Sequence, residues 1–425
     1  MKTLLKNAYI LTMEDENIIH GDILINDNRI ESINENIDAS LANIVIDCNN
    51  NLLMPGFKNV HAHGAMTFLR NRSDDVPLQK WLFEEVFPYE DKLNAEQAYL
   101  FNKIAILEYL SSGITACLDQ YLFPYETIKA SLDMGFRTSI ILIHDSKRSY
   151  VSLLKEWEDL IDTYNFKKDS LIRVFPGVHA EYTLLDEQIR LSKEIIEKYH
   201  LPFFSHNSET YQEVMDSYTR HNMSPTQYFD SLGLYKYGGG LFHGIYVSDE
   251  DIEIIKKDNL SIISCPGSNA KLASGICPLR KLLDNEINVA LGTDGAASNN
   301  SLDMFKEMYL ASALAKLVNK DPASIPAFEI LKMATINGSK AMQLNEAMYL
   351  KENQLADIIM LDLSNPSMRP IHNLINALVY SGSKSLVKMT MINGKILYKD
   401  NVFYIDEDID KLYENAQSCL KDIFS

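Results

Sequence analysis

The 425-residue chain is acidic: it has 40 Lys and Arg against 58 Asp and Glu, a formal net charge of −18, and 46% hydrophobic residues. Ordinary domains have roughly 100–200 residues, so this length predicts two domains, or one large barrel with an appendage. The 22 Tyr and 17 Phe, set against only 18 Gly and 13 Pro, exclude a disordered or collagen-like chain. We therefore expect a folded globular protein.

The charge and the cysteines also restrict partners and location. A non-specific nucleic-acid binder needs a basic face, which a net charge of −18 argues against. No segment approaches the roughly 18 apolar residues of a membrane span, and the short N-terminal apolar run meets the acids 14–16, which makes a poor signal peptide. Five widely spaced cysteines without a CxxC pair are typical of reduced residues. We expect a cytoplasmic protein that binds neither nucleic acid nor membranes.

Both ends of the chain have strand character. Short apolar segments separated by turn signals lie at 4–13, 22–33, 356–363 and 387–400. An Asn-Gly pair at 393–394 adds a hairpin signal, and residues 405–425 predict an amphipathic terminal helix. We interpret 1–54 and 355–425 as one small β-sandwich domain built from both ends, with the helix appended.

Residues 55–354 alternate between short apolar strands and helical patterns. The candidate strands lie at 57–61, 114–119, 137–143, 172–178, 202–206, 240–243, 261–264 and 288–293. Eight buried strands with helices between them over about 300 residues predict an α/β fold of the (β/α)8 TIM-barrel type. The alternative, an open doubly wound sheet, predicts a Gly-rich turn after the first strand, whereas this strand ends in His61-Ala62-His63. The barrel is favoured.

Residue types that bind metals follow four of these strands. His61 and His63 end the first strand, His206 the fifth, His243 the sixth and Asp294 the eighth. Barrel active sites form at the carboxyl ends of the strands, and residues i and i+2 of a strand point to the same side. Each residue alone has an ordinary interpretation, either a hydrogen-bonded core histidine or a helix N-cap. Their coincidence at one end of the barrel predicts a metal site, with zinc favoured and ferrous iron or manganese as alternatives.

Six motifs along the chain also recur together in a known family. They are PGFKNVHAHGAMTFLRNRSDDVPLQKWL, HNSET, FHGIYVSDEDI, SCPGSNAKLASGICPL, GTDGAASNNSLDMFKEM and ADIIMLDL. With them the sequence resembles the amidohydrolase superfamily, and within it the methylthioadenosine/S-adenosylhomocysteine deaminase and triazine-chlorohydrolase-like group. The match runs nearly end to end, including the split sheet domain. Sister enzymes are often dimers or tetramers, so the resemblance also implies a homo-oligomer.

The resemblance implies roles for the residues at the strand ends. The metal ligands would be His61, His63, His206 and Asp294. Two-metal members of the superfamily need a bridging lysine at the end of the fourth strand, where this sequence has His179 and no lysine. We therefore expect one divalent metal, which lowers the pKa of bound water and supplies hydroxide to attack an amino-bearing ring carbon.

Proton transfer would fall to the neighbouring side chains. Asp294 would accept the proton of the water, and Glu209 would protonate the ring nitrogen beside the attacked carbon. His243 would stabilise the tetrahedral centre, and ammonia would leave. The structural alternative for Glu209 is a carboxylate at a helix start.

Weaker matches imply the substrate contacts. Glu90 resembles the residue that holds ribose hydroxyls, and His179 resembles one that contacts the purine. Trp81 is either a lid over the ring or a packing residue. Glu181 stands where the family usually has proline, and there it would place a negative charge beside the base pocket and favour a more cationic or amino-rich ring.

A basic stretch after the third strand would recognise the far end of the substrate. Arg148 falls where a homocysteine-type carboxylate would be held, and His144 lies near it in the sequence.

The favoured function is a metal-dependent hydrolytic deaminase, acting on a C–N bond of a cyclic amidine. The favoured substrate is an adenosine-type nucleoside such as 5′-methylthioadenosine or S-adenosylhomocysteine. Rivals that would use the same site are deamination of a free guanine-, pterin- or pyrimidine-type base, hydrolysis of an s-triazine, and opening of a cyclic amide. A non-catalytic barrel with a structural metal is disfavoured, because structural zinc sites are closed and rich in cysteine.

Overall fold

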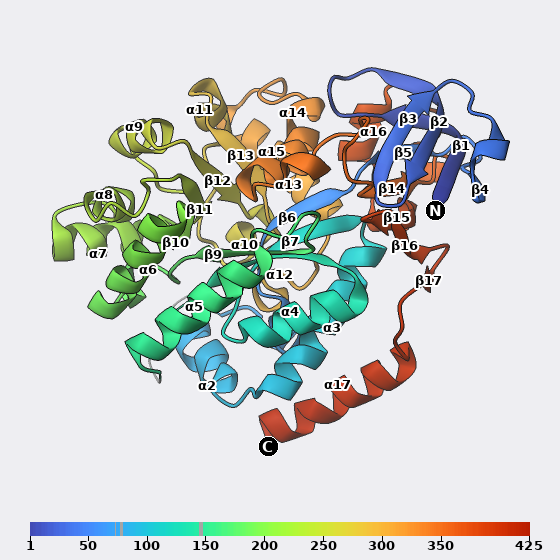
Figure 1. The fold of residues 1–425 in the computed structure, drawn as a ribbon. Helices are drawn as coiled ribbons and strands as arrows, with labels where there is room; N and C mark the ends of the chain where they lie inside the picture. The colour runs from blue at the N-terminus through green and yellow to red at the C-terminus, as the bar shows by residue number, and fades with distance from the viewer. Residues whose placement is uncertain (73, 77–79, 144–147) are drawn as a thin grey trace.

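Eight parallel strands form a closed barrel in the middle of the chain (Figure 1). The computed structural model describes residues 1–72, 74–76, 80–143 and 148–425. The barrel strands are β6 (Phe57–Ala62), β7 (Ile114–Gln120), β8 (Arg137–Leu142), β9 (Ile172–Pro176), β10 (Phe203–Asn207), β11 (Gly239–His243), β12 (Leu260–Ser264) and β13 (Asn288–Leu291). They pair in chain order as two parallel sheets, β6 to β9 and β10 to β13. The predicted (β/α)8 fold is confirmed.

Two junctions join these sheets into a ring. A parallel bridge between Gly177 and Phe204 links β9 to β10, and the Val178 amide donates to the Phe204 carbonyl at 3.2 Å. On the other side, the Asp294 amide donates to the His61 carbonyl at 2.9 Å and links β13 to β6. The strands are buried along nearly their whole length, because helices cover the outside of the barrel and side chains fill its inside.

Helices follow most of the strands and cover the barrel. They are α3 (Ala95–Ser111), α4 (Pro124–Met134), α5 (Tyr150–Tyr164), α6 (Asp186–Tyr199), α7 (Tyr211–His221), α8 (Pro225–Ser231), α9 (Asp249–Lys257), α10 (Pro266–Lys271), α11 (Leu279–Asp284), α12 (Ala296–Asn299), α13 (Met304–Asn319), α14 (Ala327–Met333) and α15 (Ile336–Ala341). The start of α7 matters most for the site. Thr210 and Glu213 form a capping box there, so the helix begins at Tyr211, two residues after Glu209.

The connection from β6 to α3 contributes to the mouth of the barrel. It contains the 3-10 helix η2 (Gly64–Leu69), a π-helical turn η3 (Trp81–Val86) and the short helix α2 (Phe87–Glu90). The C-terminal helix α17 (Ile409–Phe424) runs beside α3, well away from the small sheet in Figure 1. Its Ile423 and Phe424 pack into the same apolar cluster as Trp81 and Leu82. Helix α17 and the segment at the mouth of the barrel therefore pack against each other.

The two ends of the chain share one nine-stranded sheet. Its strands are β1 (Lys2–Leu11), β2 (Ile18–Asn26), β3 (Arg29–Asn34), β4 (Ile44–Asp47), β5 (Leu52–Pro55), β14 (Ile358–Leu361), β15 (Val387–Ile392), β16 (Lys395–Lys399) and β17 (Val402–Phe403). The N-terminal β5 pairs antiparallel with the C-terminal β14, with Met54 opposite Ile359. Strands from both ends contribute to one apolar core. The domain limits given above, 54/55 and 354/355, stay a prediction.

Smaller features of the sheet also follow from the sequence. The Asn-Gly pair forms the hairpin turn between β15 and β16, with φ of 53° at Asn393 and 75° at Gly394, which is the left-handed backbone that such turns require. Helix α16 (Leu374–Tyr380) lies in the connection from β14 to β15. Among the described residues, no helix combines the length and the apolar character needed to cross a membrane.

A buried ion pair links the barrel to the sheet. Arg137 at the start of β8 donates through Nε and Nη2 to the Asp357 carboxylate at 2.7 and 3.1 Å. The Asn393 amide donates to the same carboxylate at 2.7 Å. Burial alone would raise the pKa of Asp357, but the Arg137 guanidinium and the Lys58 ammonium hold it below its usual range. The pair is therefore ionised at neutral pH.

The change Arg137→Met should lower the free energy of unfolding by about 3–5 kcal/mol, because the buried Asp357 carboxylate loses the guanidinium that pairs with it and keeps only the charge of Lys58 nearby. Denaturation by urea measures this loss. In the double variant Arg137→Met/Asp357→Leu most of the stability should return, since an apolar pair of similar size is close to neutral. A double variant no more stable than the single one would contradict this account of the ion pair.

Candidate metal centre and its pocket

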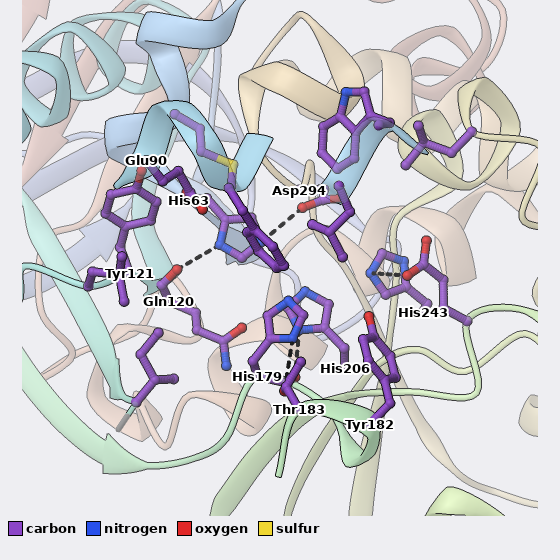
Figure 2. Close-up of a pocket in the computed structure, with 18 of the residues that line it drawn as sticks. His63, Glu90, Gln120, Tyr121, His179, Tyr182, Thr183, His206, His243 and Asp294 are labelled. Atoms are coloured by element: carbon purple, nitrogen blue, oxygen red, sulfur yellow. Dashed lines mark hydrogen bonds and ion pairs between the residues drawn. The ribbon is translucent and has the colours of Figure 1, made fainter. Parts of the chain in front are cut away.

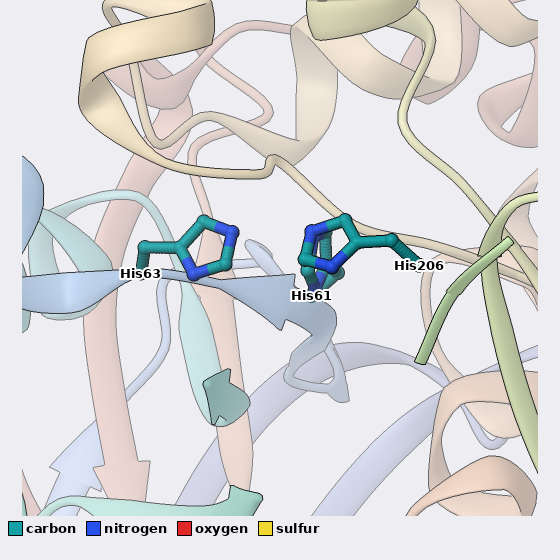
Figure 3. A group of neighbouring side chains, drawn as sticks. All are labelled: His61, His63 and His206. Atoms are coloured by element: carbon teal, nitrogen blue, oxygen red, sulfur yellow. The ribbon is translucent and has the colours of Figure 1, made fainter. Parts of the chain in front are cut away.

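Three histidines and one aspartate meet at the carboxyl ends of the barrel strands. The rings of His61, His63 and His206 face one another, with centroids 4.7 Å apart for the first two and 4.8 Å apart for His61 and His206 (Figure 3). Asp294 places Oδ1 3.2 Å from His63 Nε2 and 3.5 Å from His61 Nε2. Ligand atoms lie this close together when they surround a single ion. The four residues predicted to hold the metal are thus brought together.

Hydrogen bonds on the outer side of each ring set its orientation. Nδ1 of His63 is 2.6 Å from the Gln120 carbonyl, and Nδ1 of His206 is 2.8 Å from the His179 carbonyl. Both contacts leave Nε2 pointing into the cluster (Figure 2). His61 is fully buried, and neither of its ring nitrogens has a hydrogen-bond partner among the described residues. Backbone carbonyls behind imidazole ligands are typical of metal sites, and a buried imidazole without a partner needs one. The donor set fits a divalent ion.

Asp294 is held by its neighbours with one oxygen towards the histidines. The hydroxyls of Ser268 and Ser298 donate to Oδ2 at 2.7 and 2.8 Å, and the Gly295 amide donates to Oδ1 at 2.7 Å. The residue has φ of 62°, a strained backbone for a side chain of this kind. The surrounding contacts must maintain such strain, and strained residues of this kind cluster at functional sites.

The charges of the cluster are strongly coupled. Burial lowers the pKa of His61 and of His206 well below the usual value. Burial also opposes protonation of His63, but the hydrogen bond and charge of Asp294 outweigh it and raise the pKa to about 9. The Asp294 pKa is held well below its usual range by His63 and His61, despite burial. A metal ion would replace the proton that His63 shares with Asp294.

Glu209 and His243 lie on one side of this centre. His243 Nε2 is 3.9 Å from Glu209 Oε2, and the Ser274 hydroxyl donates to Glu209 Oε1 at 2.9 Å. The Glu209 amide donates to the Glu213 carboxylate at 2.8 Å, which ties the turn before α7. Both predicted catalytic side chains are buried and face the same cavity as Asp294.

A second polar contact fixes the ring of His243. Its Nδ1 is 2.8 Å from the Asn269 side-chain oxygen, so Nε2 is the nitrogen that faces the cavity. Burial lowers the His243 pKa, but the Glu209 and Asp294 carboxylates outweigh burial and raise it. A raised pKa favours an imidazole that can donate a hydrogen bond from Nε2.

The cavity above the metal ligands has a volume of about 400 Å³, within the range of small-molecule sites. Of the predicted substrate contacts, Trp81, Glu90 and His179 line it. The Trp81 indole is 5% exposed and its Nε1 has no partner among the described residues. Burial raises the pKa of Glu90 and lowers that of His179 to about 4, so His179 is neutral at physiological pH.

Two predicted contacts lie elsewhere. Arg148 does not line the cavity: it forms an ion pair with Glu156, and its Nη2 is 3.3 Å from the Ser152 hydroxyl, both on α5. The expectation that it holds a substrate carboxylate is therefore not supported by its position. His144 lies outside the described residues.

Glu181 also turns away from the cavity. Arg220 donates through Nε to its carboxylate at 3.0 Å, and His221 Nε2 is 2.7 Å from it, both on α7. The carboxylate is almost fully buried in this contact and is absent from the described lining of the cavity. The expected negative charge beside the base is thus neutralised by Arg220, so Glu181 does not favour a cationic ring.

The structure adds residues that sequence reasoning missed. Tyr121 follows β7 and lies beside Glu90 in the cavity (Figure 2). The sequence could have indicated Tyr121, because it lies at the carboxyl end of a predicted strand, as His206 does. Asn269, Ser268 and Ser274 position His243, Asp294 and Glu209 from the connection after β12. They stand in a motif that pointed to the family, but no local pattern indicates which side chain each would contact.

The chain matches known proteins along nearly its whole length. Residues 52–397 match the model of the amidohydrolase family, so the chain belongs to that family. Among curated proteins, the chain is 37% identical to the 5-methylthioadenosine/S-adenosylhomocysteine deaminase of Thermoanaerobacter pseudethanolicus, over 100% of this chain and 99% of that one. It is 36% identical to the 5′-deoxyadenosine deaminase of Methanosphaera stadtmanae, over 97% and 96%.

A solved structure is similar over the same length. The chain superposes with a TM-score of 0.93 on an adenosine deaminase from Xanthomonas campestris with bound zinc, at 28% identity and with 99% and 98% of the two chains covered. The predicted family resemblance is confirmed.

The change His206→Ala should weaken zinc binding more than ~100-fold, because it removes a ligand, whereas loss of a supporting contact usually costs ~10–100-fold. Ser268→Ala, which removes a hydrogen bond to Asp294, should fall in that lower range. Metal content after dialysis and competition with a chelator measure both. His20→Ala, which alters a ring in edge-to-face contact with Tyr9 in the small sheet, is the control. Full metal occupancy in His206→Ala would exclude this centre.

Proposed function

We propose that the protein is a metal-dependent hydrolase that deaminates an adenosine-type nucleoside, replacing the ring amino group by oxygen and releasing ammonia. The observation that carries the proposal is the arrangement of one cavity. Its base holds the His/Asp cluster, one side holds Glu209 and His243, and another holds Glu90. Figure 2 shows His243 and Glu90 on different sides of Asp294. One cavity therefore contains all three groups that the reaction needs: a metal centre, a proton carrier and a buried acid suited to sugar hydroxyls.

The metal is held by His61, His63, His206 and Asp294 in this proposal, and zinc is the proposed ion because imidazole and carboxylate ligands suit it. When bound, the ion supplies Lewis-acid activation of water. Zinc is also the ion named for the similar Xanthomonas campestris structure.

Proton movements are assigned to Asp294 and Glu209. The pKa of Asp294 is well below its usual range, so it is ionised and available to accept a proton from the attacking water. Glu209 delivers a proton to the ring nitrogen beside the reacting carbon, which relieves the loss of aromatic stabilisation. Its Oε1 accepts from Ser274, so the other oxygen, near His243, is left to face the substrate.

His243 and His179 would contact the ring from two directions. With Nδ1 directed to Asn269, His243 presents Nε2 to the oxygen that develops on the reacting carbon. Neutral His179 presents an imidazole at the cavity wall, where it can accept or donate a single hydrogen bond to a base edge. Neither contact requires a charged substrate ring.

Glu90 and Trp81 are assigned to the sugar. The Glu90 carboxylate is 9% exposed, and two oxygens can accept from the two hydroxyls of a ribose. The Trp81 side chain lines the cavity and can pack against the ligand. A free base or an s-triazine would leave Glu90 unused, which makes those rivals less suited to this cavity.

The change Glu209→Gln should lower kcat for ammonia release by ~10²–10⁴-fold, since it removes the transferable proton and keeps the shape of the side chain. Metal content should not change. Glu197→Gln, on the outer face of α6 in contact with Lys236, is the matched control and should retain full activity. Retention of full activity in Glu209→Gln would remove this residue from the mechanism.

A second variant distinguishes the nucleoside from the free base. Glu90→Ala should raise KM for 5′-methylthioadenosine at least ~10-fold, because ribose hydroxyls lose a buried acceptor worth about 1–3 kcal/mol. The rate with free adenine should stay the same. Equal effects on both compounds would favour a free base as the substrate. If no purine, pterin or pyrimidine in a panel released ammonia, a non-catalytic barrel would be favoured.

A further inference from the structure

A fully buried carboxylate lies outside the cavity lining and contacts two of the segments that build the site. It belongs to Glu307, in the first turn of α13. Its Oε2 accepts from the Gly267 amide at 2.7 Å, and its Oε1 accepts from the Asn299 side-chain amide at 2.8 Å. Burial raises the pKa of Glu307 to about 7, although both donors favour the charged form. Because an acid is costly to bury, these two contacts need an explanation.

The first contact fixes the start of α10. Gly267 is followed directly by Ser268 and Asn269. The Ser268 hydroxyl donates to the Asp294 carboxylate, and the Asn269 side-chain oxygen is 2.8 Å from Nδ1 of His243. A shift of the α10 backbone would therefore move the groups that orient a metal ligand and a cavity imidazole at the same time.

Glycine is required for this contact because of the space between the segments. A Cβ added at Gly267 would lie 2.5 Å from Glu307 Oε1 and 2.7 Å from Asn299 Oδ1. These distances leave no room for a side chain, so only glycine lets the α10 backbone approach the carboxylate this closely.

The second contact holds the residues around Asp294. The Asn299 side-chain amide that donates to Glu307 also donates to the Thr293 carbonyl at 2.7 Å, and Thr293 directly precedes Asp294. Ser298, the residue before Asn299, donates to the Asp294 carboxylate at 2.8 Å. One carboxylate thus joins α10 to the segment that carries Asp294.

We propose that Glu307 is a positioning residue of the active site, which aligns Asp294 and His243 with each other by holding α10 and the end of β13 together. The inference rests on the proposed function and deepens it. Functional groups must be held within about 0.5 Å of their productive geometry, and contacts behind metal ligands are typically worth ~10–100-fold in metal affinity or activity. The structural alternative is a carboxylate that only caps α10, whose loss would cost stability and leave the folded enzyme fully active.

The test uses two variants that weaken the same contact from opposite sides. Glu307→Gln keeps the shape of the side chain, but its NH2 group faces one of the two N–H donors, so one contact is lost. Gly267→Ala displaces α10 from the carboxylate. Near pH 8, above the pKa of Glu307, each should lower kcat for 5′-methylthioadenosine by ~10–100-fold and keep KM within ~3-fold. Competition with a chelator should show zinc binding about 10-fold weaker in each.

Asp251→Asn is the matched control. Asp251, on α9, is also fully buried, and its carboxylate likewise accepts from a backbone amide, that of Ser248 at 2.9 Å, and from a side chain, the Ser224 hydroxyl. This variant should lower the free energy of unfolding in urea, because it weakens a buried hydrogen-bonded acid, and should retain wild-type kcat and zinc affinity.

Wild-type kcat and zinc affinity in Glu307→Gln and Gly267→Ala, with a loss of stability alone, would overturn the inference in favour of a cap for α10. An equal loss of kcat in Asp251→Asn would also overturn it, since the effect would then follow from destabilisation. If the wild-type protein deaminates no nucleoside, the proposed function fails and zinc affinity alone decides: an unchanged affinity in both variants then overturns the positioning role.

Discussion

The site depends on one closure contact of the barrel. The hydrogen bond from the Asp294 amide to the His61 carbonyl joins the last strand to the first, and the side chains of these two residues then meet in the cluster. Residues separated by more than 200 positions thus become neighbours by the same backbone contact that completes the fold. Because parallel strands place their carboxyl ends at one edge, the ring also brings His206 and His243 to this point. Assembly of the barrel and assembly of the metal centre are the same event.

Neutral hydrogen-bonding groups fix the orientation of the functional side chains around that centre. Carbonyls behind His63 and His206, hydroxyls behind Asp294 and an amide oxygen behind His243 each satisfy one side of a functional group and leave the other free. In a buried site this arrangement costs less than additional charges would, because each neutral partner adds no repulsion. It also fixes which nitrogen of each imidazole faces the cavity, so the metal ligands need little reorganisation to bind an ion.

Much of the fold and the centre could be predicted from the sequence. Eight apolar segments marked the barrel strands to within about two residues, because buried parallel strands need continuous apolar runs. The four residues that meet in the His/Asp cluster could be named from their place at strand ends, and their role as metal ligands stays a prediction. The directions of the Arg148 and Glu181 side chains could not be predicted, because they depend on partners that no local pattern indicates. Glu181 turns to Arg220, which is 39 residues away, and this contact decides whether the acid faces the substrate. Asn269 could not be assigned for the same reason.

The helix α17 has a consequence for the order in which the protein can form. Lys92, at the end of the segment that carries Trp81 and Glu90, donates to the carbonyl of Ile423, 331 positions later. The Phe424 ring packs against Tyr89 and stacks on Phe68. During synthesis the barrel strands leave the ribosome long before this helix does. The mouth segment therefore remains without one of its packing partners through most of translation. A nascent chain can complete its barrel and its cluster of histidines while the entrance to its cavity is still unsupported.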